Sequence, residues 1–76
     1  MIQINFVSSA GVHATYNVPA TDSIRDFFEA NNINYHVGVT SLDGAPLQAG
    51  QMDMTFEDFN ITDSCWLTVV VKADNA

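Results

Sequence analysis

Apolar and polar side chains alternate along two stretches near the start of the chain. Residues 2–7 place isoleucine and phenylalanine at every second position, which is typical of a strand with one buried face. The small residues 8–11 allow a tight connection, and the alternation resumes over residues 12–18. Pro19 must end the second strand, because proline has no N–H to donate to a neighbouring strand. The pattern predicts a β-hairpin.

A helical period follows the hairpin. Its apolar stripe, with the spacing i, i+3 and i+4, consists of Ile24, Phe27 and Phe28. Either Thr21 or Asp22 can accept a hydrogen bond from the free amides of the first turn. The asparagines at 31–32 tolerate left-handed backbone and should end the helix near Ile33. We expect one helix of about three turns.

The period returns to two from Tyr35, with Val37 and Val39 on one face of the next strand and Thr40 on the other. Asp43-Gly44 supplies a tight turn, and we expect a short returning strand to begin at Leu47.

Two further elements complete the chain. Thr55 followed by Asp58 resembles a capping arrangement over one helical turn, whose aromatic rings at 56 and 59 should pack on the core. Residues 65–72 are apolar on both faces, which predicts a central strand.

This order of elements predicts an α+β fold, in which one helix packs on a mixed sheet of four to five strands. The first and last strands should be parallel neighbours in the middle of the sheet. We expect one domain over residues 1–73 and a frayed tail over 74–76. The expected core consists of Ile4, Phe6, Val18, Ile24, Phe27, Phe28, Leu67 and Val69.

Two local motifs resemble a known family. The segment Thr55-Phe56-Glu57-Asp58-Phe59-Asn60-Ile61 stands where ubiquitin has Thr-Leu-Ser-Asp-Tyr-Asn-Ile. Upstream, Pro19 followed by Thr21-Asp22-Ser23-Ile24 is similar to the Pro-Ser-Asp-Thr-Ile that opens the ubiquitin helix. The chain thus resembles the ubiquitin-like (β-grasp) family, closest in pattern to ubiquitin itself. It has Asp74-Asn75-Ala76 in place of the family's Arg-Gly-Gly, so we expect no conjugation through the tail.

Composition narrows the classes of partner. The chain has 76 residues, nine acidic and two basic, with a formal net charge of −7. This charge repels phosphate backbones and anionic membranes, so we expect neither nucleic acid nor membrane as a partner. Cys65 is the one cysteine, which excludes an intrachain disulfide and favours a reducing compartment. With no signal peptide pattern at the N-terminus, we expect a cytoplasmic protein.

The polar residues favour no enzyme chemistry. Asp53, Glu57, Asp58 and Asp63 lack the spacing of a calcium loop and indicate a solvated acidic surface. Both histidines fall on outward strand faces without a second ligand for zinc. The thiol at 65 falls on the core side with no positive neighbour to activate it. We therefore expect no catalytic residues, no metal and no cofactor.

The strand alternation also identifies a candidate binding surface on the face of the sheet away from the helix. Its residues are Val7, Trp66, Thr68 and Val70. An exposed aromatic among β-branched residues is a common interface anchor, and the family resemblance implies recognition through this same open face. The edge of the second strand, residues 13–17, is the other candidate surface.

These observations favour a non-enzymatic, non-conjugated protein–protein interaction module. Its partner would be another protein or a second copy of itself. Two alternatives stay open: a structural subunit of a phage or secretion assembly, and a carrier protein modified at its C-terminus.

Overall fold

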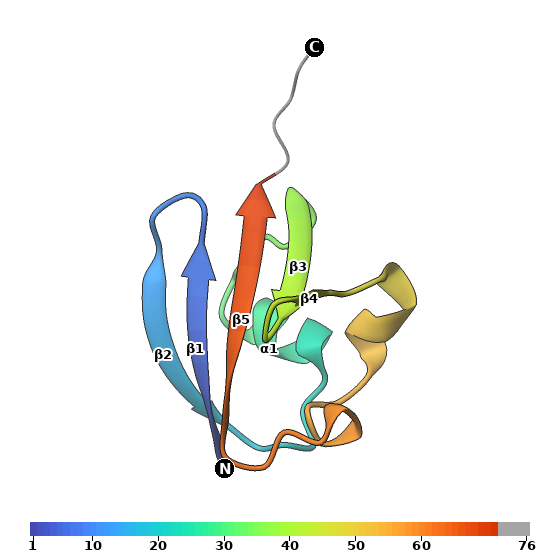
Figure 1. Cartoon of the computed structure of the whole chain (residues 1–76). Helices are drawn as coiled ribbons and strands as arrows, with labels where there is room; N and C mark the ends of the chain where they lie inside the picture. Colours follow the sequence, from blue (N-terminus) through green and yellow to red (C-terminus); the bar gives the residue numbers. More distant parts are fainter. Residues whose placement is uncertain (72–76) are drawn as a thin grey trace.

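Residues 1–71, which the computed structural model describes, form a five-stranded mixed sheet with one α-helix on one face (Figure 1). The strands are β1 (Ile2–Ser8), β2 (His13–Val18), β3 (Gly38–Leu42), β4 (Ala45–Pro46) and β5 (Ser64–Val71). The helix is α1 (Ile24–Ala30), and two short 3₁₀ segments are η1 (Ala49–Asp53) and η2 (Glu57–Phe59).

The strand order is β2-β1-β5-β3-β4, with β1 and β5 parallel at the centre and the other pairs antiparallel. The predicted α+β class, the hairpin and the central last strand are therefore confirmed. All eight predicted core side chains are buried between the sheet and α1. The predicted tail, residues 74–76, and the last residue of the predicted final strand, Lys72, lie outside the described residues.

The start of α1 differs from the prediction. Ser23 caps the helix: its Oγ accepts a hydrogen bond from the Asp26 amide at 3.0 Å. Thr21 and Asp22 precede the cap because the backbone there is held in other contacts. The Asp22 amide donates to the Pro19 carbonyl at 3.0 Å, and the Asp22 carbonyl accepts from the Phe56 amide at 3.1 Å.

The helix is also shorter than predicted. It ends at Ala30, and Asn31 is its C-terminal cap. Asn32 adopts a φ of 55°, the left-handed conformation that asparagine tolerates, so the chain turns away before Ile33. The prediction of left-handed backbone at this pair was right, and the predicted helix length was wrong.

The returning strand β4 begins at Ala45 rather than at Leu47. Asp43 and Gly44 both have positive φ, 50° and 86°, as a two-residue hairpin turn requires. Such a turn pairs Leu42 directly with Ala45, so pairing starts at once and Leu47 follows the strand.

The predicted capping motif at η2 is confirmed. The Thr55 amide donates to Asp58 Oδ2 at 3.0 Å, and the Asp58 amide donates to Thr55 Oγ1 at 3.0 Å. This reciprocal pair satisfies two amides that would otherwise lack partners. It holds the fully buried Phe56 and the half-buried Phe59 against the core.

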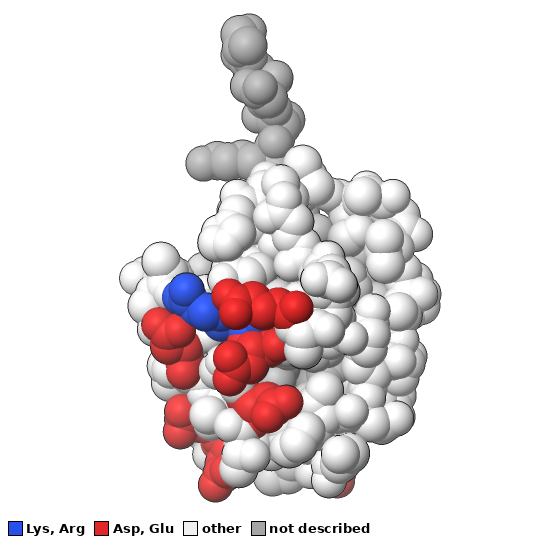
Figure 2. All heavy atoms as spheres, turned by 180° about the vertical axis from the view of Figure 1, so that it is seen from behind, with Lys and Arg blue, Asp and Glu red and all other residues white. Residues whose placement is uncertain are grey.

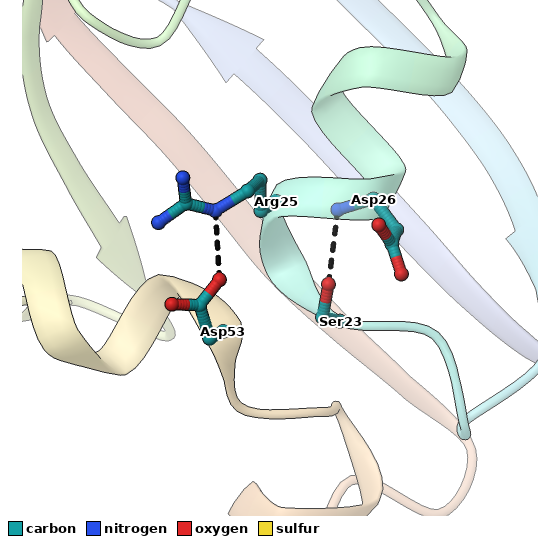
Figure 3. A network of polar contacts seen from close by, with 4 residues as sticks. All are labelled: Ser23, Arg25, Asp26 and Asp53. Atoms are coloured by element: carbon teal, nitrogen blue, oxygen red, sulfur yellow. Dashed lines mark hydrogen bonds and ion pairs between the residues drawn. The ribbon is translucent and has the colours of Figure 1, made fainter.

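An ion pair joins α1 to η1 on the surface. Arg25 Nε lies 2.8 Å from Asp53 Oδ1, next to the Ser23 cap (Figure 3). The Arg25 side chain is partly exposed and that of Asp53 is well exposed, so solvent screens the pair and its contribution is about 1 kcal/mol or less. The packing of the apolar stripe, not this pair, holds the helix in place.

Candidate protein-binding face

One face of the sheet is covered by α1, and the opposite face is open (Figure 1). Because successive side chains of a strand point to opposite faces, burial of Ile4, Phe6, Leu67 and Val69 sends their neighbours to the open face. Strand pairing then sets which of those neighbours adjoin.

Four open-face residues from three strands lie together near the C-terminal end of β5. Val7 on β1 pairs with Thr68 on β5, and Val39 on β3 pairs with Val70 on β5. Val39 and Val70 are exposed, whereas Val7 and Thr68 are half-buried. The result is a small β-branched surface that spans the three central strands.

Trp66 is the largest side chain on this face and is 51% exposed. Its backbone is held on both sides by the turn residue Asp43. The Trp66 amide donates to Asp43 Oδ1 at 2.8 Å, and the Trp66 carbonyl accepts from the Asp43 amide at 2.8 Å. The indole lies toward β2, with its centroid 6.1 Å from that of the His13 ring. We call Val7, Val39, Trp66, Thr68 and Val70 the open-face patch.

Sequence reasoning placed four members of the open-face patch correctly on the open face but missed Val39. The alternation put Val37 and Val39 on one side of a strand. In the structure the strand begins only at Gly38, and Thr40 and Leu42 are its buried residues. Which side of β3 is buried depends on its pairing with β5, a strand far along the chain.

The open face carries no Asp, Glu, Lys or Arg at the outward positions of β1, β2, β3 and β5 within the described residues. Five exposed carboxylates lie instead on α1, η1 and η2: Asp26, Glu29, Asp53, Glu57 and Asp58. Two more exposed carboxylates lie next to strands, Asp43 in the β3–β4 turn and Asp63 just before β5. Figure 2 shows acidic side chains gathered around a basic one on one side of the molecule.

The histidines and the acidic residues that the sequence raised as candidates for chemistry are not arranged as a metal site in residues 1–71. Within residues 1–71, no group of three His, Cys, Asp or Glu is arranged to hold a metal ion. His13 and His36 are both exposed, as predicted, but only His13 lies on a strand, β2. His36 lies in the connection between α1 and β3, because β3 begins only at Gly38. The acidic residues of η1 and η2 are exposed, consistent with the solvated surface that the sequence indicated.

Cys65 is buried under the sheet, 2% exposed, on the core side. Burial, with a smaller effect from the negative charge of Asp43, raises the pKa of its thiol from 9.0 to about 11. The thiolate is the reactive form of cysteine, so this sulfur is a packing group and not a nucleophile.

We therefore expect Cys65 to react with an alkylating reagent at pH 8 only when the chain unfolds. Iodoacetamide labelling, followed by intact mass measurement, should be slow in buffer and complete in 6 M guanidinium. The raised pKa also means that the folded state holds the proton more tightly than the unfolded state. Stability from this group is present below pH 9 and should fall as pH rises toward 11. Rapid labelling of the folded protein would contradict the buried position.

A separate apolar groove of about 250 Å³ lies on the helix side, between the β1–β2 turn and the segment that follows α1. Phe6 and Val69 line its buried part, and the exposed side chains of Val12, Val37 and Val71 line its rim. The groove does not include any member of the open-face patch.

The architecture is that of the ubiquitin-like, β-grasp fold, in which a mixed sheet holds one helix. A ubiquitin-like protein from Trypanosoma brucei has a similar structure, with a TM-score of 0.68, 18% identity and 95% of each chain covered. A solved protein of Arabidopsis thaliana is similar at a TM-score of 0.63 and 17% identity, covering 97% of this chain and 89% of that one. These identities establish the fold alone.

Neither the comparison with protein-family models nor the comparison with curated proteins finds a match. In the described part of the chain, the helix is too short to cross a membrane.

Proposed function

We propose that this protein is a non-enzymatic, non-conjugated ubiquitin-like interaction module that binds another protein through the open-face patch. The observation that carries this proposal is Trp66, a large aromatic side chain that is half exposed on a face no described element covers. Folding leaves this ring partly in water, although burying an aromatic ring is strongly favourable. A partner that covers it would recover that free energy.

The surroundings of Trp66 fit this role. Two hydrogen bonds to Asp43 fix the backbone at Trp66, so the backbone at this position need not be ordered on binding. Val39 and Val70 add exposed apolar area farther along the same face, and no Asp, Glu, Lys or Arg occupies an outward position of β1, β2, β3 or β5 in residues 1–71. Interface centres are typically apolar, rich in aromatic residues and poor in charge.

Other residues support a binding role rather than catalysis. Cys65 is kept protonated by burial, and the ubiquitin-like fold is generally non-enzymatic. The lone reduced thiol suits a cytoplasmic location.

The test compares Trp66→Ala with a variant on another exposed surface, Val37→Ala. Val37 is 43% exposed at the rim of the helix-side groove, so it removes exposed apolar area, though less than Trp66→Ala, away from the open-face patch. The immobilised wild type and both variants are incubated with lysate of the source cells, and retained proteins are quantified by mass spectrometry. Thermal melts of each variant report folding.

We expect proteins retained by the wild type to remain with Val37→Ala and to be lost with Trp66→Ala. Loss of an aromatic anchor typically costs about 2 kcal/mol or more of binding free energy, which is a roughly thirtyfold weaker complex. Both variants should melt close to the wild type, because neither side chain belongs to the buried core. Equal retention by Trp66→Ala would contradict binding through this face.

A further inference from the structure

The two edge strands of the sheet differ in how well they are protected against pairing with a further strand. On one side β4 has only two residues and ends at Pro46, whose nitrogen carries no hydrogen. A very short strand with a proline is a common way to block further pairing at a sheet edge. On the other side β2 is a regular strand of six residues. It is the outermost strand, and no described element pairs with its outer side (Figure 1).

The pairing of β2 with β1 determines which backbone groups of β2 face outward. The Ser8 amide donates to the Val12 carbonyl at 2.9 Å, next to the Val7 and His13 pair. Hydrogen-bonded and non-hydrogen-bonded pairs alternate along an antiparallel ladder. The even-numbered residues of β2 therefore bond to β1, and His13, Thr15 and Asn17 direct their N–H and C=O groups outward.

This outer edge lacks the usual protection against pairing. The segment 13–18 contains no proline, no lysine and no acidic residue, and its register with β1 is unbroken by a bulge. The negative charge of the chain lies mainly elsewhere. In Figure 2, viewed from behind, the acidic side chains gather on the left, whereas the β2 side on the right is nearly free of charged atoms. Two copies that approach through β2 would keep their acidic sides apart.

We propose that β2 pairs antiparallel with β2 of a second copy of this chain, about a two-fold axis through Thr15. In this register Thr15 faces Thr15 of the other copy, and His13 faces Asn17 on each side. All three outward-facing residues of each strand then exchange backbone hydrogen bonds with the other copy. The ten strands form one continuous sheet. This inference rests on the edge of the sheet and does not depend on the open-face patch.

The neighbouring registers are poorer. A shift toward the C-terminus brings Pro19 opposite His13, and proline has no N–H to donate. A shift toward the N-terminus brings Gly11 opposite Asn17, but Gly11 lies in the turn before β2 with a φ of 94°. The register centred on Thr15 is the one that uses only strand residues.

The side chains of β2 also fit this register. Ala14 of one copy faces Tyr16 of the other, which places a small residue against a large one on the helix side. The Tyr16 ring already packs against Phe27, with ring centroids 5.1 Å apart, so its position is set before pairing. On the open face, threonine faces threonine, a favourable cross-strand pair. The strand is self-complementary, as a two-fold interface requires.

The first test is Thr15→Pro, measured by sedimentation velocity over a range of concentrations. The Thr15 amide faces outward, so proline removes bonds to the second copy without removing a bond to β1. We expect the wild type to show a monomer–dimer equilibrium and Thr15→Pro to remain monomeric. A thermal melt of the variant checks that the domain is folded.

The second test uses the fact that position 15 faces itself across the two-fold axis. Thr15→Lys and Thr15→Glu each place like charges opposite one another and should weaken self-association about tenfold or more. An equimolar mixture of the two should form a heterodimer, because opposite charges then face each other. The same pair of substitutions at Thr21, an exposed residue outside β2, serves as the matched control and should leave the wild-type equilibrium unchanged.

A wild type that stays monomeric up to ~1 mM, where even weak association is detectable, would overturn the proposal. A dimer that survives Thr15→Pro, or a mixture of the charged variants that stays monomeric, would overturn it as well. Trp66→Ala should leave the dimer intact. Failure of β2 pairing and failure of open-face binding are therefore separate results.

Discussion

Phe27→Ala should leave the chain largely unfolded at 25 °C. Phe27 is 1% exposed and sits at the centre of the aromatic core. Its ring centroid lies 5.1 to 6.4 Å from four other aromatic rings: Phe6, Tyr16, Phe28 and Phe56. Truncating a buried phenylalanine to alanine costs about 3–5 kcal/mol. A domain of this size has a free energy of unfolding of roughly the same magnitude, so little stability remains.

The measurement is urea unfolding followed by far-UV circular dichroism. Glu29→Ala, an exposed substitution on the same helix, is the control and should stay within about 0.5 kcal/mol of the wild type. Phe27→Leu keeps most of the apolar volume and should fall between the two. If the free energy of unfolding of Phe27→Ala lies within about 1 kcal/mol of the wild-type value, the aromatic cluster does not contribute most of the stability.

Gly38→Ala is the second substitution with a large expected effect. Gly38 begins β3 and pairs with Val71 of β5. A Cβ at this position would overlap the Val70 carbonyl and lie 2.8 Å from the Val71 Cα. These are backbone atoms of the central strand, which cannot rotate away as a side chain can. β3 would have to separate from β5, so we expect a loss of about 3 kcal/mol of stability.

Gly50→Ala is the matched control, because nothing lies within 4 Å of a Cβ at Gly50. Its φ is not positive, and removing glycine from such a position stabilises by about 0.4–1 kcal/mol through the unfolded state. The same chemical change should therefore have opposite signs at the two sites. Denaturant unfolding of both variants measures this difference. Equal effects would mean that β3 and β5 do not approach as closely as described.

Gly38→Ala also bears on the open face. Val39 and Val70 pair directly beside Gly38, so separation of the strands would move both side chains. Binding through the open-face patch should weaken in any fraction of Gly38→Ala that remains folded, whereas Gly50→Ala should bind like the wild type.

The sequence by itself determined the order of the elements and the buried side of most of them. A period of two in β1, β2 and β5 and the stripe of α1 identified all eight predicted core residues, because burial of one face imposes a repeat that is visible locally. The same alternation placed Trp66 on the open face. The Thr55 and Asp58 cap was also visible, since both partners lie three residues apart.

Only the tertiary structure decided the features that depend on distant segments. Ser23 caps α1 because the backbone just before it bonds to residues 56 and 57, and Val39 joins the open-face patch because β3 pairs with β5. The contrast between the blocked edge at β4 and the open edge at β2, and the placement of the acidic residues away from β2, likewise depend on the assembled sheet. Periodicity within a strand shows which residues share a face of the sheet. Whether that face packs on the core or contacts solvent depends on strand order and register, which are set by contacts between distant segments.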